Sequence, residues 1–260
     1  PITYYVSPQL WAWKENRIRI IKKNIDQMLV IFPFEEQWYK DRGVEAAFVG
    51  HPIFDEWTPS TKEELCGLLN LNHEKQILVL YPGSRLQEVK KHLPILVQAA
   101  KKLKDEIPSI QVILGAAPQI DWTQWNLPDW IQVESKYPQK ALECGDLAFV
   151  ASGTSTVEAT VFGTPMIVTY KMATLSWWLS KILVNVPFAG MVNILAEKEI
   201  MPELLQENAT VEKLFSTALS ILNNPKRLQK MKEDLNLIQN KLKGEGASKR
   251  AAIKILELVE

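Results

Sequence analysis

The stretch DLAFVASGTSTVEATVFGTPMIVTYK, residues 146–171, decides the fold that we predict for this chain. Residues 147–150 form a short apolar run that is typical of a buried strand, and only small residues follow at 151–155. Residues 157–162 carry the apolar face of a helix, and residues 166–170 form a second apolar run. Strand, helix and strand in this order indicate a βαβ unit, which requires a parallel sheet with crossover helices.

The turn at residues 151–155 has the composition of a ligand-binding loop. Gly153 lets a ligand approach the backbone, and the unpaired N–H groups of a helix N-terminus favour a bound phosphate. Glu158 follows Thr154 by about one helical turn, where a carboxylate can accept hydrogen bonds from a ribose diol beyond a diphosphate. An ordinary capped helix with a solvent-facing Glu158 is the alternative, and this stretch alone leaves both interpretations open.

The composition excludes several classes of function. The 260 residues include 30 basic and 30 acidic side chains, which argues against a protein that coats nucleic acid. Cys66 and Cys144 are the only cysteines, and His51, His73 and His92 show no metal-ligand spacing, so we expect no metal and no cofactor. The sequence has no run of about 18 apolar residues that could span a membrane. Cysteine usage and the lack of a visible signal peptide favour a cytoplasmic protein.

The pattern of elements divides the chain into three parts. Residues 1–57 show a β-α-β-α-β pattern that is too short for a complete domain of about 100 residues. Because Pro1 leads directly into a strand, we expect a fragment that lacks an upstream segment. Residues 58–242 are predicted to form a doubly wound α/β domain that is all-helical after residue 171. Residues 243–260 are predicted to form a helix that crosses back or packs on a neighbouring subunit.

Further candidate site residues lie at the ends of predicted elements. Arg85 follows the strand at residues 77–81, where doubly wound sheets bind ligands, and its guanidinium can grip a diphosphate; a plain surface arginine is the alternative. Ser84 can cap the next helix or contact substrate. His51 ends the last strand of the first part, with either a structural or a substrate and interdomain role. Asn193 opens a helix, either as its N-cap or as an amide that faces the ligand.

Trp177 and Trp178 lie in the stretch TLSWWLSKILVNVPFAG, which is apolar on more than one face. Such a helix is commonly part of a protein core. The nearby Lys171 and Lys181 also make it suitable for contact with a membrane surface.

Six stretches, in the same order, resemble one family: YYVSPQLWAWKENRI, FPFEEQWY, FVGHP, YPGSR, SGTSTVEATVFGTPMIVTYK and NILAEKEIMPELLQ. The chain is similar over nearly its whole length to lipid-A-disaccharide synthases, which are GT-B glycosyltransferases. The SPQ-WAW and SGT-T-E---FGTP blocks are the specific ones. The resemblance implies an α/β protein with two Rossmann-like doubly wound domains, the first incomplete, and C-terminal helices.

The resemblance also implies a reaction. UDP-2,3-diacylglucosamine is joined to 2,3-diacylglucosamine 1-phosphate (lipid X), with inversion at the anomeric carbon, to give lipid A disaccharide 1-phosphate and UDP without a metal. The diphosphate would be held by Arg85 and the small-residue turn, and the ribose by Glu158. The nucleotide-binding residues implied in this way are Arg85, Ser152, Gly153, Thr154, Ser155, Glu158 and Asn193.

The same resemblance implies a cytoplasmic enzyme that is peripheral on the inner membrane. Trp177 and Trp178 would then meet acyl chains or the lipid surface. The family can exchange C-terminal elements between subunits, so a homodimer is compatible with the resemblance.

Two departures from the family pattern affect these expectations. The family places a further stretch before Ile2, with a Gly-rich acceptor-side loop and an Asp that acts as general base. We therefore expect this chain alone to bind UDP without catalysing transfer, with His51 as the best remaining, though poor, candidate base. Val192 replaces the usual Pro before Asn193.

Three other functions remain open at this stage: a UDP-sugar epimerase of the same fold, a non-catalytic UDP-binding fragment, and a helical interaction module built on the helices after Gly244. Nucleotide binding separates them, since the interaction module predicts none. Isomerisation of a UDP-sugar without an acceptor would favour the epimerase.

Overall fold

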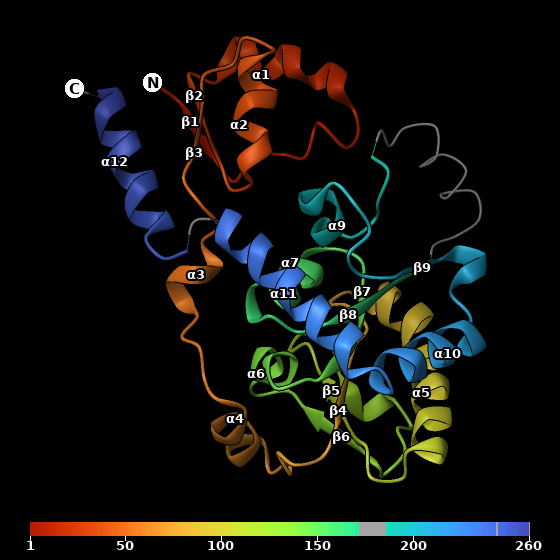
Figure 1. Ribbon diagram of the computed structural model, residues 1–260. Helices are drawn as coiled ribbons and strands as arrows, with labels where there is room; N and C mark the ends of the chain where they lie inside the picture. The colour runs from red at the N-terminus through yellow and green to blue at the C-terminus, as the bar shows by residue number, and fades with distance from the viewer. Residues whose placement is uncertain (172–185, 243, 260) are drawn as a thin grey trace. The chain divides into compact units, whose positions relative to one another are not determined.

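A computed structural model of the chain describes residues 1–171, 186–242 and 244–259 (Figure 1). The chain divides into two compact units. Unit 1 includes Pro1–Thr58 and Gln239–Glu260, and unit 2 includes Pro59–Ala173 and Pro187–Ile238. The N-terminal and C-terminal segments thus belong to the same unit.

Unit 1 is built on a three-stranded parallel sheet in the order β1-β2-β3. Its strands are β1 (Thr3–Tyr5), β2 (Gln27–Val30) and β3 (Ala46–Phe48). The central strand β2 is buried along its whole length, because apolar side chains cover both of its faces. The helices of this unit are η1 (Glu15–Arg17), α1 (Ile18–Asn24), α2 (Pro33–Lys40), α3 (Ile53–Glu56) and α12 (Ala247–Val259).

The last helix is tied to the first segment through one carboxylate. Asp55, inside α3, accepts hydrogen bonds from the backbone N–H groups of Gly246 (2.6 Å), Ala247 (3.0 Å) and Ser248 (2.7 Å) at the start of α12. Burial raises the pKa of Asp55, but these hydrogen bonds outweigh it and hold the pKa below its ordinary value. Asp55 therefore satisfies the first N–H groups of α12 as an N-cap side chain does, although it lies 192 residues before Ala247 in the sequence.

Unit 2 is a six-stranded parallel sheet in the order β6-β5-β4-β7-β8-β9 (Figure 1). The strands are β4 (Ile77–Tyr81), β5 (Gln111–Gly115), β6 (Ile131–Glu134), β7 (Leu147–Ala151), β8 (Met166–Tyr170) and β9 (Glu203–Leu205). The chain runs outward from β4 to β6, returns, and then runs outward the other way from β7 to β9. Strand order therefore reverses between β4 and β7, as in a doubly wound fold.

Helices cover both faces of this sheet, because right-handed crossovers in opposite directions place their helices on opposite sides. The helix α5 crosses from β4 to β5 and packs beside α10, whereas α6 packs beside α7, which crosses from β7 to β8 (Figure 1). The helices are α4 (Lys62–Leu69), α5 (Leu86–Glu106), η2 (Trp122–Gln124), α6 (Pro138–Glu143), α7 (Thr154–Phe162), α9 (Met191–Ala196), η3 (Gln206–Asn208), α10 (Val211–Leu222) and α11 (Pro225–Lys241).

The expectation that the chain is all-helical after residue 171 was wrong. The strand β9 pairs in parallel with β8, with Val168 opposite Glu203. The segment is three residues long, begins with a charged side chain and has no alternating pattern. Its strand conformation comes from pairing with a distant strand rather than from its own residues.

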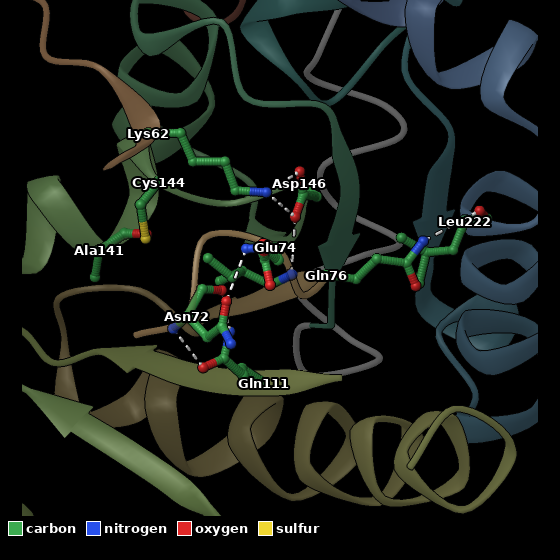
Figure 2. A network of polar contacts seen from close by, with 10 residues as sticks. Lys62, Asn72, Glu74, Gln76, Gln111, Ala141, Cys144, Asp146 and Leu222 are labelled. Carbon is green, nitrogen blue, oxygen red and sulfur yellow. Dashed lines mark hydrogen bonds and ion pairs between the residues drawn. The ribbon is translucent and has the colours of Figure 1, made fainter. Parts of the chain in front are cut away.

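A polar network connects the amino ends of the strands of this sheet (Figure 2). The Asp146 carboxylate, just before β7, accepts from the backbone N–H of Ile77 in β4 (2.9 Å) and from the Lys62 ammonium group (2.7 Å). The Gln111 side chain both accepts from and donates to the backbone of Asn72, at 2.8 and 2.7 Å. The Asp146 contact fixes β4 against β7 at their amino ends, and the Gln111 contacts fix β5 to the segment before β4.

Within the described part of the chain, no helix combines the length and the apolar character that crossing a bilayer requires.

We expect Asp146→Ala to lower the free energy of unfolding by about 1–3 kcal/mol, because it leaves a strand N–H and an ammonium group without their acceptor. Urea denaturation measures this change. The matched control is Asp105→Ala, which removes an exposed ion pair with Lys101 and should change stability by less than about 0.5 kcal/mol. Equal effects of the two variants would show that Asp146 does not anchor the sheet edge.

Candidate functional site

Arg85 and the small-residue turn lie where the strand order reverses. The strands β4 and β7 are neighbours, with Tyr81 opposite Val150 at their carboxyl ends. The loop that leads to Arg85 follows β4, and the small-residue turn, Ser152 to Ser155, follows β7. In doubly wound sheets this crevice is the place where ligands bind.

The small-residue turn is open. Gly153 is the N-cap of α7, with φ 141° and ψ −152°, a conformation that is essentially restricted to glycine. Among the described residues other than its two chain neighbours, no atom lies within 4 Å of the place that a Cβ at Gly153 would take. Thr154 is exposed and Ser155 half-buried at the start of the helix. The first N–H groups of α7 therefore border open space, as an anion site requires.

A loop from behind braces this turn. The Ser152 hydroxyl donates to the carbonyl of Ala189 (2.7 Å). The Thr156 hydroxyl donates to the carbonyl of Gly153 (2.8 Å), and its oxygen accepts from the backbone N–H of Met191 (3.2 Å). The glycine conformation is thus held by hydrogen bonds on the side away from solvent.

Asn193 differs from both interpretations of its sequence. It is the third residue of α9, whose N-cap is Gly190, and its side chain is fully buried. Its oxygen accepts from the N–H groups of Ile200 (2.9 Å) and Met201 (3.0 Å), and its nitrogen donates to the Met201 carbonyl and to Glu203, both at 2.8 Å. An amide with all these bonds holds the loop in place and does not face a ligand.

Glu203 continues this network, and sequence reasoning assigned it no role. Its carboxylate accepts from the N–H groups of Ala189 (2.8 Å) and Gly190 (2.9 Å). The loop that braces Ser152 is therefore itself positioned by Glu203 and Asn193. Val192 is fully buried as the second residue of α9, a place in the first turn where either Val or Pro fits.

Arg85 is available to a ligand. Its side chain is 83% exposed, and one guanidinium nitrogen lies 3.3 Å from Glu88. Arg85 itself is the N-cap of α5, so Ser84 lies outside the helix and does not cap it; the Ser84 carbonyl accepts from Gln119. Gly83 has φ 108°, and a Cβ there would lie 2.6 Å from a Glu88 oxygen, so the loop requires glycine.

Glu158 is a half-buried carboxylate on the first turns of α7. Burial raises the pKa of this carboxyl group. Hydrogen bonds with Gln139 (3.1 Å) and the Tyr81 hydroxyl lower the pKa and offset part of this effect. Two partners use about half of the roughly four acceptor positions of a carboxylate. The remaining positions can accept from a diol.

Tyr81 and Gln139 were not identified from the sequence. Burial and the charge of Glu158 raise the pKa of Tyr81, so its hydroxyl remains a donor. A Cβ at Gly115 would lie 2.5 Å from the Tyr81 ring, which shows how closely the ring packs on β5. The only available signal was that Tyr81 ends an apolar strand.

His51 belongs to unit 1. Its Nδ1 accepts from the backbone N–H of Ile53 (3.3 Å), and its ring packs on Phe32, with 5.7 Å between ring centroids. Burial lowers its pKa to about 4. The hydrogen bond to Ile53 fixes the start of α3. Because its pKa is low, His51 is a weak base and a poor candidate for the general base.

The predicted lipid-contact residues Trp177 and Trp178 lie outside the described residues. Over the described ranges, no group of three or more His, Cys, Asp or Glu side chains is arranged to hold a metal ion.

Solved structures show the fold class. The structure titled S. aureus MnaA-UDP co-structure has a TM-score of 0.63 at 13% identity, covering 93% of this chain and 61% of its own. The spinosyn rhamnosyltransferase SpnG, complexed with thymidine diphosphate, has a TM-score of 0.59 at 14% identity, covering 99% of this chain and 67% of its own. The fold is that of GT-B glycosyltransferases, which confirms the predicted fold class.

Sequence comparison gives the family. The model described as Lipid-A-disaccharide synthetase matches residues 1–256. The lipid-A-disaccharide synthase of Syntrophus aciditrophicus is 37% identical over 267 residues, covering all of this chain and 70% of the relative. That of Koribacter versatilis is 38% identical over 272 residues, with the same coverage. This chain belongs to the lipid-A-disaccharide synthase family of glycosyltransferases, which act in lipid A biosynthesis.

We expect Gly153→Ala to destabilise the protein by about 1–3 kcal/mol, because alanine cannot adopt the observed backbone conformation without strain. Gly67→Ala is the matched control, since a Cβ at either glycine meets no neighbouring atom within 4 Å. Gly67 lies inside the helix α4, where alanine should stabilise by about 0.5–1 kcal/mol. Thermal unfolding measures both, and stabilisation by both variants would contradict the assigned turn.

The pKa of His51 predicts a loss of stability in acid. The unfolded chain takes up a proton near pH 6.5, whereas folded His51 stays neutral down to about pH 4. Its contribution is complete above pH 6.5 and is lost as the pH falls through this window, by about 3 kcal/mol at most. His51→Gln should flatten the pH dependence of urea denaturation between pH 6.5 and 4. An unchanged slope would show that His51 is not buried as described.

Proposed function

We propose that the crevice between the carboxyl ends of β4 and β7 is the donor-nucleotide site of a lipid-A-disaccharide synthase. Arg85 and the turn from Ser152 to Ser155 hold the diphosphate of UDP-2,3-diacylglucosamine, and Glu158 holds its ribose. The proposal rests chiefly on one observation: an exposed guanidinium and an open helix N-terminus follow neighbouring strands at the point where strand order reverses.

The roles follow from the charges. A diphosphate next to the N-terminus of α7 replaces Glu88 as the partner of Arg85, because a guanidinium binds phosphate oxygens bidentately. When the glycosidic bond to the donor breaks, negative charge develops on the departing UDP. Arg85 and the N–H groups of the turn stabilise that charge in the transition state.

Glu158 distinguishes a nucleotide from a simple diphosphate. It lies about one helical turn beyond the phosphate-binding N–H groups, and Tyr81 and Gln139 hold its carboxylate in place. A ribose diol can donate to the remaining oxygen positions. Asn193 contributes indirectly, through the loop that braces Ser152.

The reaction joins the donor to 2,3-diacylglucosamine 1-phosphate with inversion, giving lipid A disaccharide 1-phosphate and UDP. An inverting transfer needs a general base near the acceptor hydroxyl. We assign none among the described residues, because the Nδ1 of His51 already accepts from the backbone N–H of Ile53 and burial lowers the pKa of the ring.

The substrates carry acyl chains, which supports peripheral contact with the cytoplasmic face of the inner membrane. We include Trp177 and Trp178 in this proposal on their amino-acid sequence alone. A homodimer through C-terminal elements is likewise proposed from the family resemblance.

Calorimetric titration with UDP tests the donor site. We expect saturable binding by the chain, weakened about 10- to 100-fold in Arg85→Ala and in Glu158→Ala, because each removes charge-assisted hydrogen bonds to the ligand. Inorganic pyrophosphate should separate the two roles: Arg85→Ala weakens its binding, whereas Glu158→Ala leaves it unchanged.

The controls are Arg227→Ala on α11 and Glu212→Ala on α10, which remove exposed side chains of the same charge. Unchanged UDP affinity in both site variants would overturn the proposed site. UDP binding lost in the controls as well would point to a general effect of charge. Isomerisation of a UDP-sugar without an acceptor would favour an epimerase instead.

A further inference from the structure

His92 is buried in the core of unit 2, yet it makes two polar contacts. It lies on the helix α5 with 1% of its surface exposed, between the buried residues Val89 and Leu96 of the same face. Its Nδ1 lies 3.2 Å from the carbonyl oxygen of Pro82, and its Nε2 lies 3.0 Å from the backbone nitrogen of Lys171. The proposed reaction uses neither contact.

The two contacts allow one protonation state. A carbonyl oxygen only accepts, so Nδ1 must carry a hydrogen. A backbone N–H only donates, so Nε2 must offer its lone pair. The ring is therefore the neutral Nδ1–H tautomer. A proton on Nε2 would face the N–H of Lys171, and two donors repel each other.

The position of these contacts gives them a consequence for the donor site. Pro82 begins the loop that leads to Arg85, and Lys171 directly follows β8. The strands β4 and β8 are the two neighbours of β7, whose carboxyl end carries the small-residue turn. His92 thus joins the backbone on both sides of that turn.

Resting on the proposed donor site, we propose that His92 is a positioning residue for nucleotide binding: it fixes the loop of Arg85 relative to the end of β8, and does so only as the neutral Nδ1–H tautomer. The ligand concerned is a nucleoside diphosphate. Protonation of His92 releases the Lys171 contact and weakens binding.

The surroundings of the ring set the direction of the pH effect. Burial lowers the pKa of His92; among its described neighbours, Glu88 raises it and Lys91 lowers it, and the Tyr170 ring of β8 packs on it at 5.6 Å between centroids. The neutral form therefore persists at neutral pH. The part of the UDP affinity that depends on His92 should be constant above about pH 6.5 and fall as the pH drops through the lowered pKa.

The experiment compares UDP titrations of the wild-type chain and His92→Leu from pH 7.5 downward. At pH 7.5 the variant should bind UDP about 3- to 30-fold more weakly, as expected for coupling through a positioned loop. The ratio of the two Kd values should approach 1 as the pH falls. Titration of UDP and of Glu158 affects both proteins and cancels in this ratio. His92→Gln, whose carbonyl oxygen can accept from Lys171, should recover part of the affinity without the His92-dependent pH change.

Equal Kd values for the wild type and a folded His92→Leu variant would overturn this inference and leave the donor site intact, whereas no UDP binding by the wild type would overturn both. If the Leu variant does not fold, ¹⁵N NMR of the wild-type imidazole decides: the Nδ1–H tautomer supports the proposal, and the Nε2–H tautomer contradicts it.

Discussion

The pairing of β4 with β7 is the constraint on which the rest of unit 2 depends. These strands are far apart in the chain but adjacent in the sheet, and Asp146 fixes them at their amino ends. Their carboxyl ends then diverge into two loops of different chemistry, one with Arg85 and one with Gly153. Because the crossover helices of the two halves lie on opposite faces, nothing from the sheet itself closes the crevice between these loops.

The open turn requires support from buried polar groups. The backbone conformation of Gly153 persists only when the surrounding structure determines it. Thr156 holds the turn directly, by donating to the Gly153 carbonyl. Glu203 holds it indirectly, through the loop behind the turn. Buried, fully bonded side chains such as Asn193 therefore hold the backbone of the loop behind the turn in place.

Opposite charges at the two ends of the crevice suit a nucleoside diphosphate. The guanidinium of Arg85 attracts phosphate, while the carboxylate of Glu158 repels it and favours hydroxyl donors. One guanidinium nitrogen of Arg85 lies 3.3 Å from Glu88, and the rest of the side chain is exposed. In the proposed site, the cation and the carboxylate would therefore take different parts of the donor.

The amino-acid sequence by itself determined the parallel α/β fold, the small-residue turn, the place of Arg85 after a strand and the place of Glu158 one turn into a helix, because strand periodicity, glycine bends and helix starts are properties of neighbouring residues. Only the tertiary structure decided β9, the partners of Asn193 and the bridge made by His92. A buried polar side chain takes its role from the groups that satisfy its hydrogen bonds. The partner of His92 at Lys171 lies 79 residues away, and those of Asn193 lie in the segment that follows its helix. The neighbouring residues in the sequence do not indicate such partners. From the sequence alone, Asn193 was therefore interpreted as a helix cap or a ligand contact, and His92 was given no role.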